Sequence, residues 1–358
     1  MLASLEEKAR PASIAPIALA ALVLLLIVAL GFSLSVGAID IPFRAVVLIL
    51  ADTLGLPVGP VDQSAATVLL SIRLPRAIVG VLVGGGLAIA GAAMQGLFRN
   101  PLADPALIGV STGAALMAVA TIVLGGALIG QLGPVLAPFA LPVGAFVGGL
   151  LTTFLIQQVA TRDGQVQIAT MLLAGIAVNA LAGALVGTMT FLSDDQQLRE
   201  LTFWMMGSLA STTWRGLLPA IPFLLLPILV LPKFWRSLNA MLLGEIEAQY
   251  LGFDVDRAKR RLIILVALVT GAGVAVSGVI GFVGLVTPHL VRLSIGPDHR
   301  YLLPCSALLG ASLLLLADMA ARTLVLPAEL PIGIVTACFG APFFLWLLAR
   351  RRDGHGFF

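Results

Sequence analysis

Two arginines placed three residues apart carry the clearest chemical signal in the sequence. Arg73 and Arg76 flank Pro75 in the segment Arg-Leu-Pro-Arg, directly before a long apolar run, and Arg322 lies near the end of a later apolar run. The planar guanidinium fork of arginine binds carboxylates through paired hydrogen bonds. The pattern therefore predicts a site for acidic groups of a partner. Arginines that only extend their charge out of an apolar layer are the alternative interpretation.

The sequence lacks the motifs through which a transporter draws energy from ATP or from protons. None of its three lysines, Lys8, Lys233 and Lys259, follows a glycine, so the phosphate-binding loop GxxxxGK[ST] is absent. The middle of the apolar runs holds almost no ionisable side chain, although proton-driven carriers place such groups there. We therefore expect energy to reach this chain from a separate protein.

The longest polar segment, residues 233–261, is the natural contact for such a protein. Its apolar residues are spaced as two short amphipathic helices, at about 236–258, with a break at Gly244. A pair of short helices can sit in a cleft on an ATPase. Acids in a solvated loop are the alternative interpretation of Glu245 and Glu247.

Metal or haem ligation finds little support in the sequence. Cys305 and Cys338 lie in apolar runs without the spacing of a metal site, which favours small buried side chains. His289 follows Pro288, where a structural hydrogen bond is a better interpretation than a haem ligand. His299 and His355 are weaker candidates still.

The composition identifies lipid as the solvent of most of this chain. Of 358 residues, 59% are hydrophobic and 11% are charged, and the mean hydropathy is +1.07. Soluble domains average about 25% charged residues. The net charge of +3 is small, and the arginines are spread among loops, so nucleic-acid binding is not indicated. We expect one all-α, polytopic membrane domain over residues 1–358.

About ten membrane spans are predicted from the apolar runs. A cleavable signal peptide is the alternative for the first run, which is long for that role. Loop 37–72 is expected to carry a short surface helix, and residues 193–208 are expected to form an interfacial half-helix rich in aromatic residues. The predicted spans are 17–34, 77–97, 106–124, 139–160, 168–190, 214–232, 262–277, 279–293, 301–320 and 332–349.

The count of ten depends on dividing residues 262–293. As one helix this segment would be roughly 48 Å long, too long for a hydrocarbon core of about 30 Å. With ten spans and the N-terminus inside, fifteen of the 21 Lys and Arg residues lie in cytoplasmic segments, as the positive-inside rule requires. Glycines four apart, Gly80/Gly84, Gly144/Gly148 and Gly183/Gly187, predict close helix packing within the chain or, less simply, at a seam between subunits.

Several motifs along the chain resemble the FecCD family, the permease subunits of ATP-binding-cassette importers for cobalamin, ferric siderophores and haem. The matching segments cover nearly the whole chain in the family's order. They are RLPR, GAAMQGLFRNPLADP, GVSTG, LTFWMMGSL, LGEIEAQYLG, GFVGLVTPHLVR, DHRYLLP and ELPIGIVTACFGAPFFLWLL. The resemblance implies the type II importer permease fold.

The resemblance also implies roles for particular residues. Arg73, Arg76 and Arg322 match arginines that receive glutamates from a periplasmic substrate-binding protein. The segment LGEIEAQYLG matches helices that dock on the ATPase, which implicates Gly244, Glu245, Glu247, Leu251 and Gly252. The cytoplasmic gate would contain Asn100 and Leu102 in the NPLADP turn, and Ile168 and Ala169 before the fifth span.

As a family member the chain would be a transport subunit without an enzymatic activity or a cofactor of its own. It would form a homodimer in the bacterial inner membrane, with both termini and the basic tail 350–358 in the cytoplasm. Two ATPase subunits would bind ATP and Mg²⁺, and a periplasmic protein would deliver substrate.

The segment SDDQQLRELTFWMMGSLA most resembles haem permeases, so haem is the expected substrate. A ferric siderophore is the runner-up, and cobalamin is disfavoured because the segment GQVQIAT departs from the hydroxyl-rich form of cobalamin importers. An ion-coupled carrier and a haem-binding membrane protein without transport are the alternatives from other classes.

Overall fold

A computed structural model of the chain describes residues 14–37, 39–56, 61–162 and 164–351. Most of the predicted leader 1–15 and of the predicted basic tail 350–358 lies outside the described residues. Within them the chain is almost entirely helical, and a two-stranded antiparallel hairpin is its one sheet. The all-α fold class predicted from the sequence is thereby confirmed.

The first half of the chain runs from the N-terminal helix to the hairpin. Its elements are α1 (Ile14–Ser35), α2 (Phe43–Thr53), α3 (Gln63–Val68), the wide turn η2 (Leu69–Arg73), α4 (Leu74–Leu97), the 3-10 turn η3 (Pro105–Ile108), α5 (Val110–Leu124), α6 (Gly126–Gln131), α7 (Gly133–Leu136), η4 (Ala137–Phe139), α8 (Ala140–Ala160), β1 (Thr161–Arg162) and β2 (Gln165–Val166). The predicted surface helix in loop 37–72 is therefore present as α2 and α3.

The second half contains the remaining helices. They are α9 (Ile168–Phe191), α10 (Asp195–Met205), α11 (Trp214–Val230), η5 (Leu231–Phe234), α12 (Trp235–Leu243), α13 (Glu245–Tyr250), α14 (Val255–Ser277), α15 (Val283–Ile295), α16 (His299–Thr323) and α17 (Ile332–Arg351). The predicted division of residues 262–293 is confirmed, because α14 ends and α15 begins within it. Helix α10 is the predicted half-helix, and Asp194 caps it with a capping box.

Seven of the described helical segments are long and apolar enough to cross a membrane. Three shorter apolar helices, α5, α15 and α17, complete the set that the sequence predicts. The count of ten spans stays a prediction, since length and composition alone do not place a helix in a bilayer.

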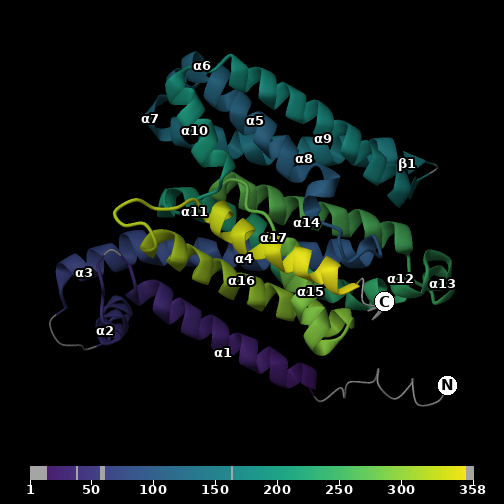
Figure 1. The fold of residues 1–358 in the computed structure, drawn as a ribbon, viewed down its shortest axis with the longest axis horizontal. Coiled ribbons are helices and arrows are strands. Elements are labelled where there is room, and N and C mark those ends of the chain that lie inside the picture. Colours follow the sequence, from purple (N-terminus) through teal and green to yellow (C-terminus); the bar gives the residue numbers. More distant parts are fainter. Residues whose placement is uncertain (1–13, 38, 57–60, 163, 352–358) are drawn as a thin grey trace.

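The helices form two side-by-side groups whose axes run along the long dimension of the molecule (Figure 1). One group contains α5, α8 and α9, and the other contains α1, α4 and α16, with α14 contacting both α4 and α8. Helices α2, α3 and α10 lie at one end, which we call the outer end. The hairpin, α12 and α13 lie at the opposite end, here the inner end.

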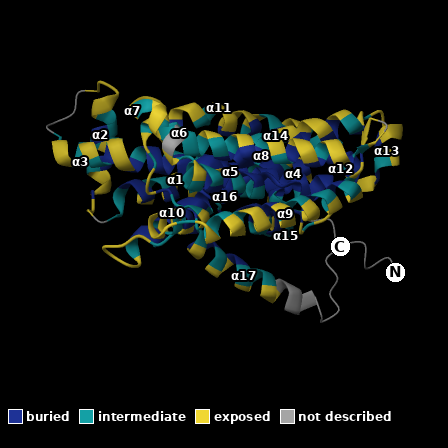
Figure 2. Ribbon diagram, turned by 90° about the horizontal axis from the view of Figure 1, so that it is seen from above, coloured by how far each residue is buried: buried dark blue, intermediate teal, exposed yellow. Residues whose placement is uncertain are grey.

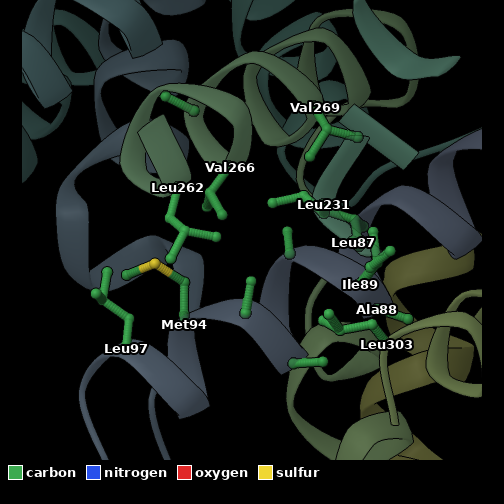
Figure 3. Close-up of a cluster of buried hydrophobic side chains, with 14 of the residues drawn as sticks. Leu87, Ala88, Ile89, Met94, Leu97, Leu231, Leu262, Val266, Val269 and Leu303 are labelled. Atoms are coloured by element: carbon green, nitrogen blue, oxygen red, sulfur yellow. The ribbon is translucent and has the colours of Figure 1, made fainter. Parts of the chain in front are cut away.

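Helix α4 forms the centre of the core. Nearly all of its residues are buried, and Figure 2 shows it surrounded by the other helices. Its side chains Leu87, Ile89 and Met94 lie among Leu262 and Val266 of α14 and others in the cluster drawn in Figure 3. Helix α17, by contrast, diverges from the body of the molecule (Figure 2).

Glycine allows α4 and α16 to cross at close range. A Cβ atom on Gly84 would collide with the carbonyl oxygen of Gly310, and one on Gly310 would collide with Gly84. Gly144 and Gly148 likewise face Thr121 and Met117 of α5. Two of the three predicted glycine pairs thus serve packing within the chain. The third differs, because Gly183 and Gly187 are exposed on α9 and a Cβ there would meet nothing within 4 Å.

Two boundaries differ from the sequence prediction. Helix α14 begins at Val255 and not near 262, because Asp254 caps it by accepting a hydrogen bond from the Arg257 amide (3.0 Å). The short helices consequently end at Tyr250, so the predicted range 236–258 is too long. The polar break after α8 is a β-hairpin, in which Thr161 pairs with Val166.

The crossing of α4 and α16 yields the first prediction. Gly84→Ala should lower the thermal unfolding midpoint in detergent, because the added methyl group meets a backbone carbonyl that cannot move aside, and such overpacking costs about 1–3 kcal/mol. Gly273→Ala in α14 is the matched control, since its new Cβ would lie 3.7 Å from its nearest neighbour and the change favours helix. Equal midpoints for the two variants would contradict this account of the crossing.

Candidate functional site

The predicted functional residues separate to the two ends of the molecule. The three arginines lie on elements that meet at the outer end, namely η2, the start of α4 and the end of α16 (Figure 1). The NPLADP turn, the start of α9 and the helices α12 and α13 lie at the inner end. The apolar core separates these groups, so the fold assigns them to opposite surfaces.

At the outer end, Arg76 is the centre of a buried ion-pair network. Its Nε lies 3.0 and 3.1 Å from the two carboxylate oxygens of Asp318. Its Nη1 and Nη2 donate to the two carboxylate oxygens of Glu329, at 3.1 and 2.9 Å. Asp318 is almost fully buried, whereas the side chain of Glu329 is 40% exposed. One guanidinium therefore binds one buried and one accessible carboxylate.

The other two arginines are buried against the backbone at the end of α1 and just beyond it. Arg73 donates to the carbonyls of Leu34 and Ser35, at 2.7 and 2.6 Å, and to that of Ile39. Arg322 donates to the carbonyl of Ser33 at 2.6 Å, and its Nε lies 3.8 Å from Asp318. These contacts hold the end of α1 against α4 and α16.

The sequence therefore identified the arginines but not their surroundings. Arg73, Arg76 and Arg322 lie beneath the outer surface with intramolecular partners, so their role in docking stays a prediction. Glu329 was missed, although it is the lone acid between the last two apolar runs. That isolation was the available signal.

In the NPLADP turn at the inner end, the polar side chains stabilise the turn itself. Asn100 is exposed, and its Oδ1 accepts from the amide of Leu102 at 2.9 Å. Leu102 is exposed. The carboxylate of Asp104 caps η3 by accepting from the amide of Ala106 at 2.8 Å. Burial raises the pKa of Asp104, and the hydrogen bond from Ala106 opposes that shift.

The 3-10 turn η3, which begins at the end of the NPLADP turn, contacts α9 beyond the first turns of that helix. Asn179 donates to the carbonyl of Ala106 at 3.2 Å, and Gly175 lies against the carbonyl of Leu107. Ile168 is half-buried and packs on the core, whereas Ala169 is exposed. These contacts join η3 to the middle of α9. A single cytoplasmic gate formed by Asn100, Leu102, Ile168 and Ala169 therefore stays a prediction.

The helices α12 and α13 meet at Gly244, as the sequence predicts. This residue adopts φ +140° and ψ 155°, and a Cβ there would collide with the carboxylate of Glu247, so glycine is required. Leu238 and Met241 of α12 are buried. Side chains on both sides of the break form an exposed apolar patch. We call it the apolar docking surface because the sequence predicts docking there, and it consists of Leu242, Leu243, Ile246, Tyr250 and Leu251.

The two predicted contact acids differ in their surroundings. The carboxylate of Glu245, a side chain that is 34% exposed, lies 2.5 Å from Nζ of the buried Lys259. Glu247 is exposed. Gly252 follows α13 with φ +87°, a left-handed conformation that favours glycine. No sequence pattern distinguishes Lys259, because a lysine among other basic residues near a membrane is ordinarily solvated.

The two histidines in the described part of the chain, His289 and His299, are not arranged as a metal site. Among the described residues, no group of three His, Cys, Asp or Glu side chains is close enough to hold a metal ion. His289 is buried with its ring 6.2 Å from that of Phe343. His299 lies 2.8 Å from Asn239 of α12 through Nδ1, and His355 lies outside the described residues.

A cavity of about 1020 Å³ opens near the outer end. It is lined by α8, α10, the start of α11 and the end of α14, including Arg199, Trp204 and Arg215. None of the predicted docking, gate or coupling residues lines it. The cavity is therefore separate from the sites identified in the sequence.

Comparison with known proteins places these features in one family. Residues 24–350 match the FecCD transport family. The chain is 50% identical over 333 residues to the hemin transport system permease protein HmuU of Yersinia pestis, covering 93% of this chain and 95% of that protein. It is 44% identical over 292 residues to the cobalamin import system permease protein BtuC of Halobacterium salinarum, covering 82% and 76%. A solved structure described as an inward-facing metal-chelate type ABC transporter superposes with a TM-score of 0.80 at 34% identity, covering 94% of this chain and 99% of that one.

The outer network yields the second prediction. Asp318→Asn should lower the thermal unfolding midpoint strongly, because it leaves the buried guanidinium groups of Arg76 and Arg322 without their shared carboxylate. Removing one partner of a buried ion pair costs about 3–5 kcal/mol. Glu329→Gln should cost clearly less, since Glu329 is 40% exposed and water can replace its contacts. A midpoint for Asp318→Asn equal to the wild-type value would show that the network does not stabilise the fold.

Proposed function

The chain belongs to the FecCD transport family and is an ABC importer permease, and from that premise we propose that its substrate is haem, carried from the periplasm to the cytoplasm. The permease is a transport subunit and not an enzyme. Its family implies an ATPase partner and a substrate-binding protein. We further propose a homodimer in the bacterial inner membrane, which works by alternating access of a central path.

The observation that carries the substrate proposal is the 50% identity with a hemin permease over almost the whole of both chains. The segment around α10, with its sequence SDDQQLRELTFWMMGSLA, adds to this support. It lies at the outer end, where substrate would enter (Figure 1). A ferric siderophore or cobalamin is the second candidate, favoured by the 44% identity with a cobalamin permease and by the likeness to a metal-chelate transporter.

The inner end offers the surface that an ATPase would bind. Ile246, Tyr250 and Leu251 expose apolar side chains on a short, well-anchored helix pair, and exposed apolar patches of this kind mark contact sites. Two copies of a cytoplasmic ATP-binding-cassette protein would bind here, with ATP and Mg²⁺ on the ATPase. The start of α1 and the end of α17 lie at this same end of the molecule, which supports cytoplasmic termini (Figure 1).

The open face of α9 is the proposed seam and path. Less than a quarter of this helix is buried within one chain. Gly183 and Gly187 lie on the open face, where small residues let a second helix approach closely in lipid. A second copy of the chain would cover this face and the diverging helix α17. Substrate would then pass between the two copies, with the start of α9 and the NPLADP turn as the cytoplasmic gate.

The outer arginines support docking of a binding protein through exchange of partners. Arg76 already binds Glu329, which is accessible at 40% exposure. An acidic side chain from a binding protein could replace Glu329 without exposing Asp318. Arg73 and Arg322, which hold the backbone near α1, would then keep Arg76 in position.

Substrate identity is tested by transport. A strain that lacks this chain should fail to grow on haem as the iron source and should recover with the wild-type gene, while uptake of a ferric siderophore and of cobalamin continues. Purified complex in proteoliposomes should take up haemin only with ATP. Normal growth on haem with loss of growth on a siderophore would contradict the haem proposal and leave the permease assignment intact.

ATPase docking is tested by a charge on the apolar docking surface. Ile246→Asp should weaken copurification of the ATPase about tenfold or more, because a buried interface side chain often contributes about 2 kcal/mol. Ile39→Asp at the outer end is the matched control, since Ile246 and Ile39 are 64% and 63% exposed. Unchanged retention of the ATPase by Ile246→Asp would contradict docking at α13.

A further inference from the structure

A buried lysine joins three elements of the inner end. Lys259 lies in the first turns of α14, and its side chain is only 3% exposed. Its Nζ lies 2.5 Å from the Glu245 carboxylate and 3.2 Å from the carbonyl oxygen of Val166. One ammonium group thus binds a side chain of α13 and the backbone of β2 at once.

The two partners of Lys259, Glu245 and Val166, belong to two regions with different proposed roles, the ATPase contact and the gate. Glu245 is the first residue of α13, whose exposed face is the apolar docking surface. Val166 is the last residue of β2, and only Gln167 lies between it and the start of α9. Lys259 therefore links α13, the proposed docking helix, to the strand that leads directly into the start of α9, the proposed gate.

A second contact fixes the same hairpin to the same helix. Arg260 donates to the carbonyl of Gly164, in the turn between β1 and β2. The hairpin itself is closed by the pairing of Thr161 with Val166, and the amide of Gln167 donates to the carbonyl of Ala160 at 2.9 Å. Only Gln167, whose amide is hydrogen-bonded, separates Val166 from α9. A displacement of Val166 should therefore also displace the start of α9.

Burial makes this bridge costly to break. An ammonium group taken out of water is tolerated only while charged or polar partners surround it. A displacement of α13 must therefore move Glu245 together with Lys259 and Val166, or else leave the buried charge without a partner. Within the described residues, the exposed Glu247 makes no comparable hydrogen bond or ion pair with the hairpin.

We propose that Lys259 is the positioning residue that transmits movement of the ATPase-docking helix α13 to the start of α9. The proposal rests on the proposed function, because it takes α13 as the ATPase contact and the start of α9 as the gate. Nucleotide binding at the partner moves α13, Glu245 carries Lys259 with it, and the carbonyl of Val166 shifts the first turn of α9. Lys259 itself contacts neither substrate nor ATPase.

The test follows the gate directly in the full permease with its ATPase. Ala169→Cys reports the exposed first turn of α9, in a Cys338→Ser background, because Cys338 is exposed and Cys305 is buried. In the otherwise wild-type protein, the rate of maleimide labelling should differ between the nucleotide-free complex and the complex trapped with ATP and vanadate. In Lys259→Met the ratio of these rates should fall to about one, while the ATPase still copurifies and hydrolyses ATP.

Two further variants separate coupling from folding. Arg261→Met removes a positive charge two residues further along α14, at an exposed position, and should keep the wild-type labelling ratio. Glu245→Ala removes the other side of the bridge. Lys259 keeps the carbonyl of Val166, and water can enter where the 34% exposed side chain stood, so this variant should fold and also lose the response. Haemin uptake by proteoliposomes should fall in Lys259→Met and Glu245→Ala, and ATP hydrolysis should continue in Lys259→Met.

The outcomes distinguish this role from the proposed function beneath it. A full nucleotide response in both Lys259→Met and Glu245→Ala would overturn the role of Lys259, with the permease function intact. Loss of ATPase copurification in Glu245→Ala would also overturn it, because the acid would then be a docking contact. No nucleotide response in the wild-type complex would contradict the gate itself, and the coupling role with it.

Discussion

A charge removed from water must keep its partner, and this constraint organises both ends of the molecule. At the outer end Arg76 lies between Asp318 and Glu329. At the inner end Lys259 lies between Glu245 and the carbonyl of Val166. In each case the buried base joins elements that are far apart in the sequence. An apolar chain has few directional contacts in lipid, so these pairs fix which segments lie together at its surfaces.

Between the two ends, the core is apolar and closely packed. Such a core should transmit a displacement of one helix to its neighbours with little local deformation. Helix α4 runs through the centre with Leu87 and Met94 among the cluster of Figure 3. The crossing at Gly84 and Gly310 brings two backbones together without side chains between them. Because such contacts do not deform gradually, we expect the helices in this core to shift as units.

The sequence predicts the helices better than it predicts their partners. Hydropathy and length locate the apolar helices and the division of residues 262–293, and the break at Gly244 follows from amphipathic spacing. The family resemblance carries the permease assignment. The pairing of Arg76 with Asp318 links residues 242 positions apart, and no local pattern encodes it. Lys259 is one of several basic residues in a polar segment, and its burial depends on β2 folding against α14. The early start of α14 at Val255 depends on the cap at Asp254, whose signal the polar surroundings obscure.

The two ion-pair networks share a further property. It concerns how a subunit without its own ATP-binding motif can respond to partners. Each places its base inside and a partly exposed acid nearer the surface on which a partner is proposed to bind, since Glu329 and Glu245 are 40% and 34% exposed. An exposed carboxylate loses little when water or a partner replaces its contact, whereas the buried base cannot be left alone. A partner that supplies or displaces an acid therefore acts on the buried base without unfolding the helices that carry it. Under the proposed function, such exchanges would let partners act on either end of the chain without an ionisable group in the middle of the membrane.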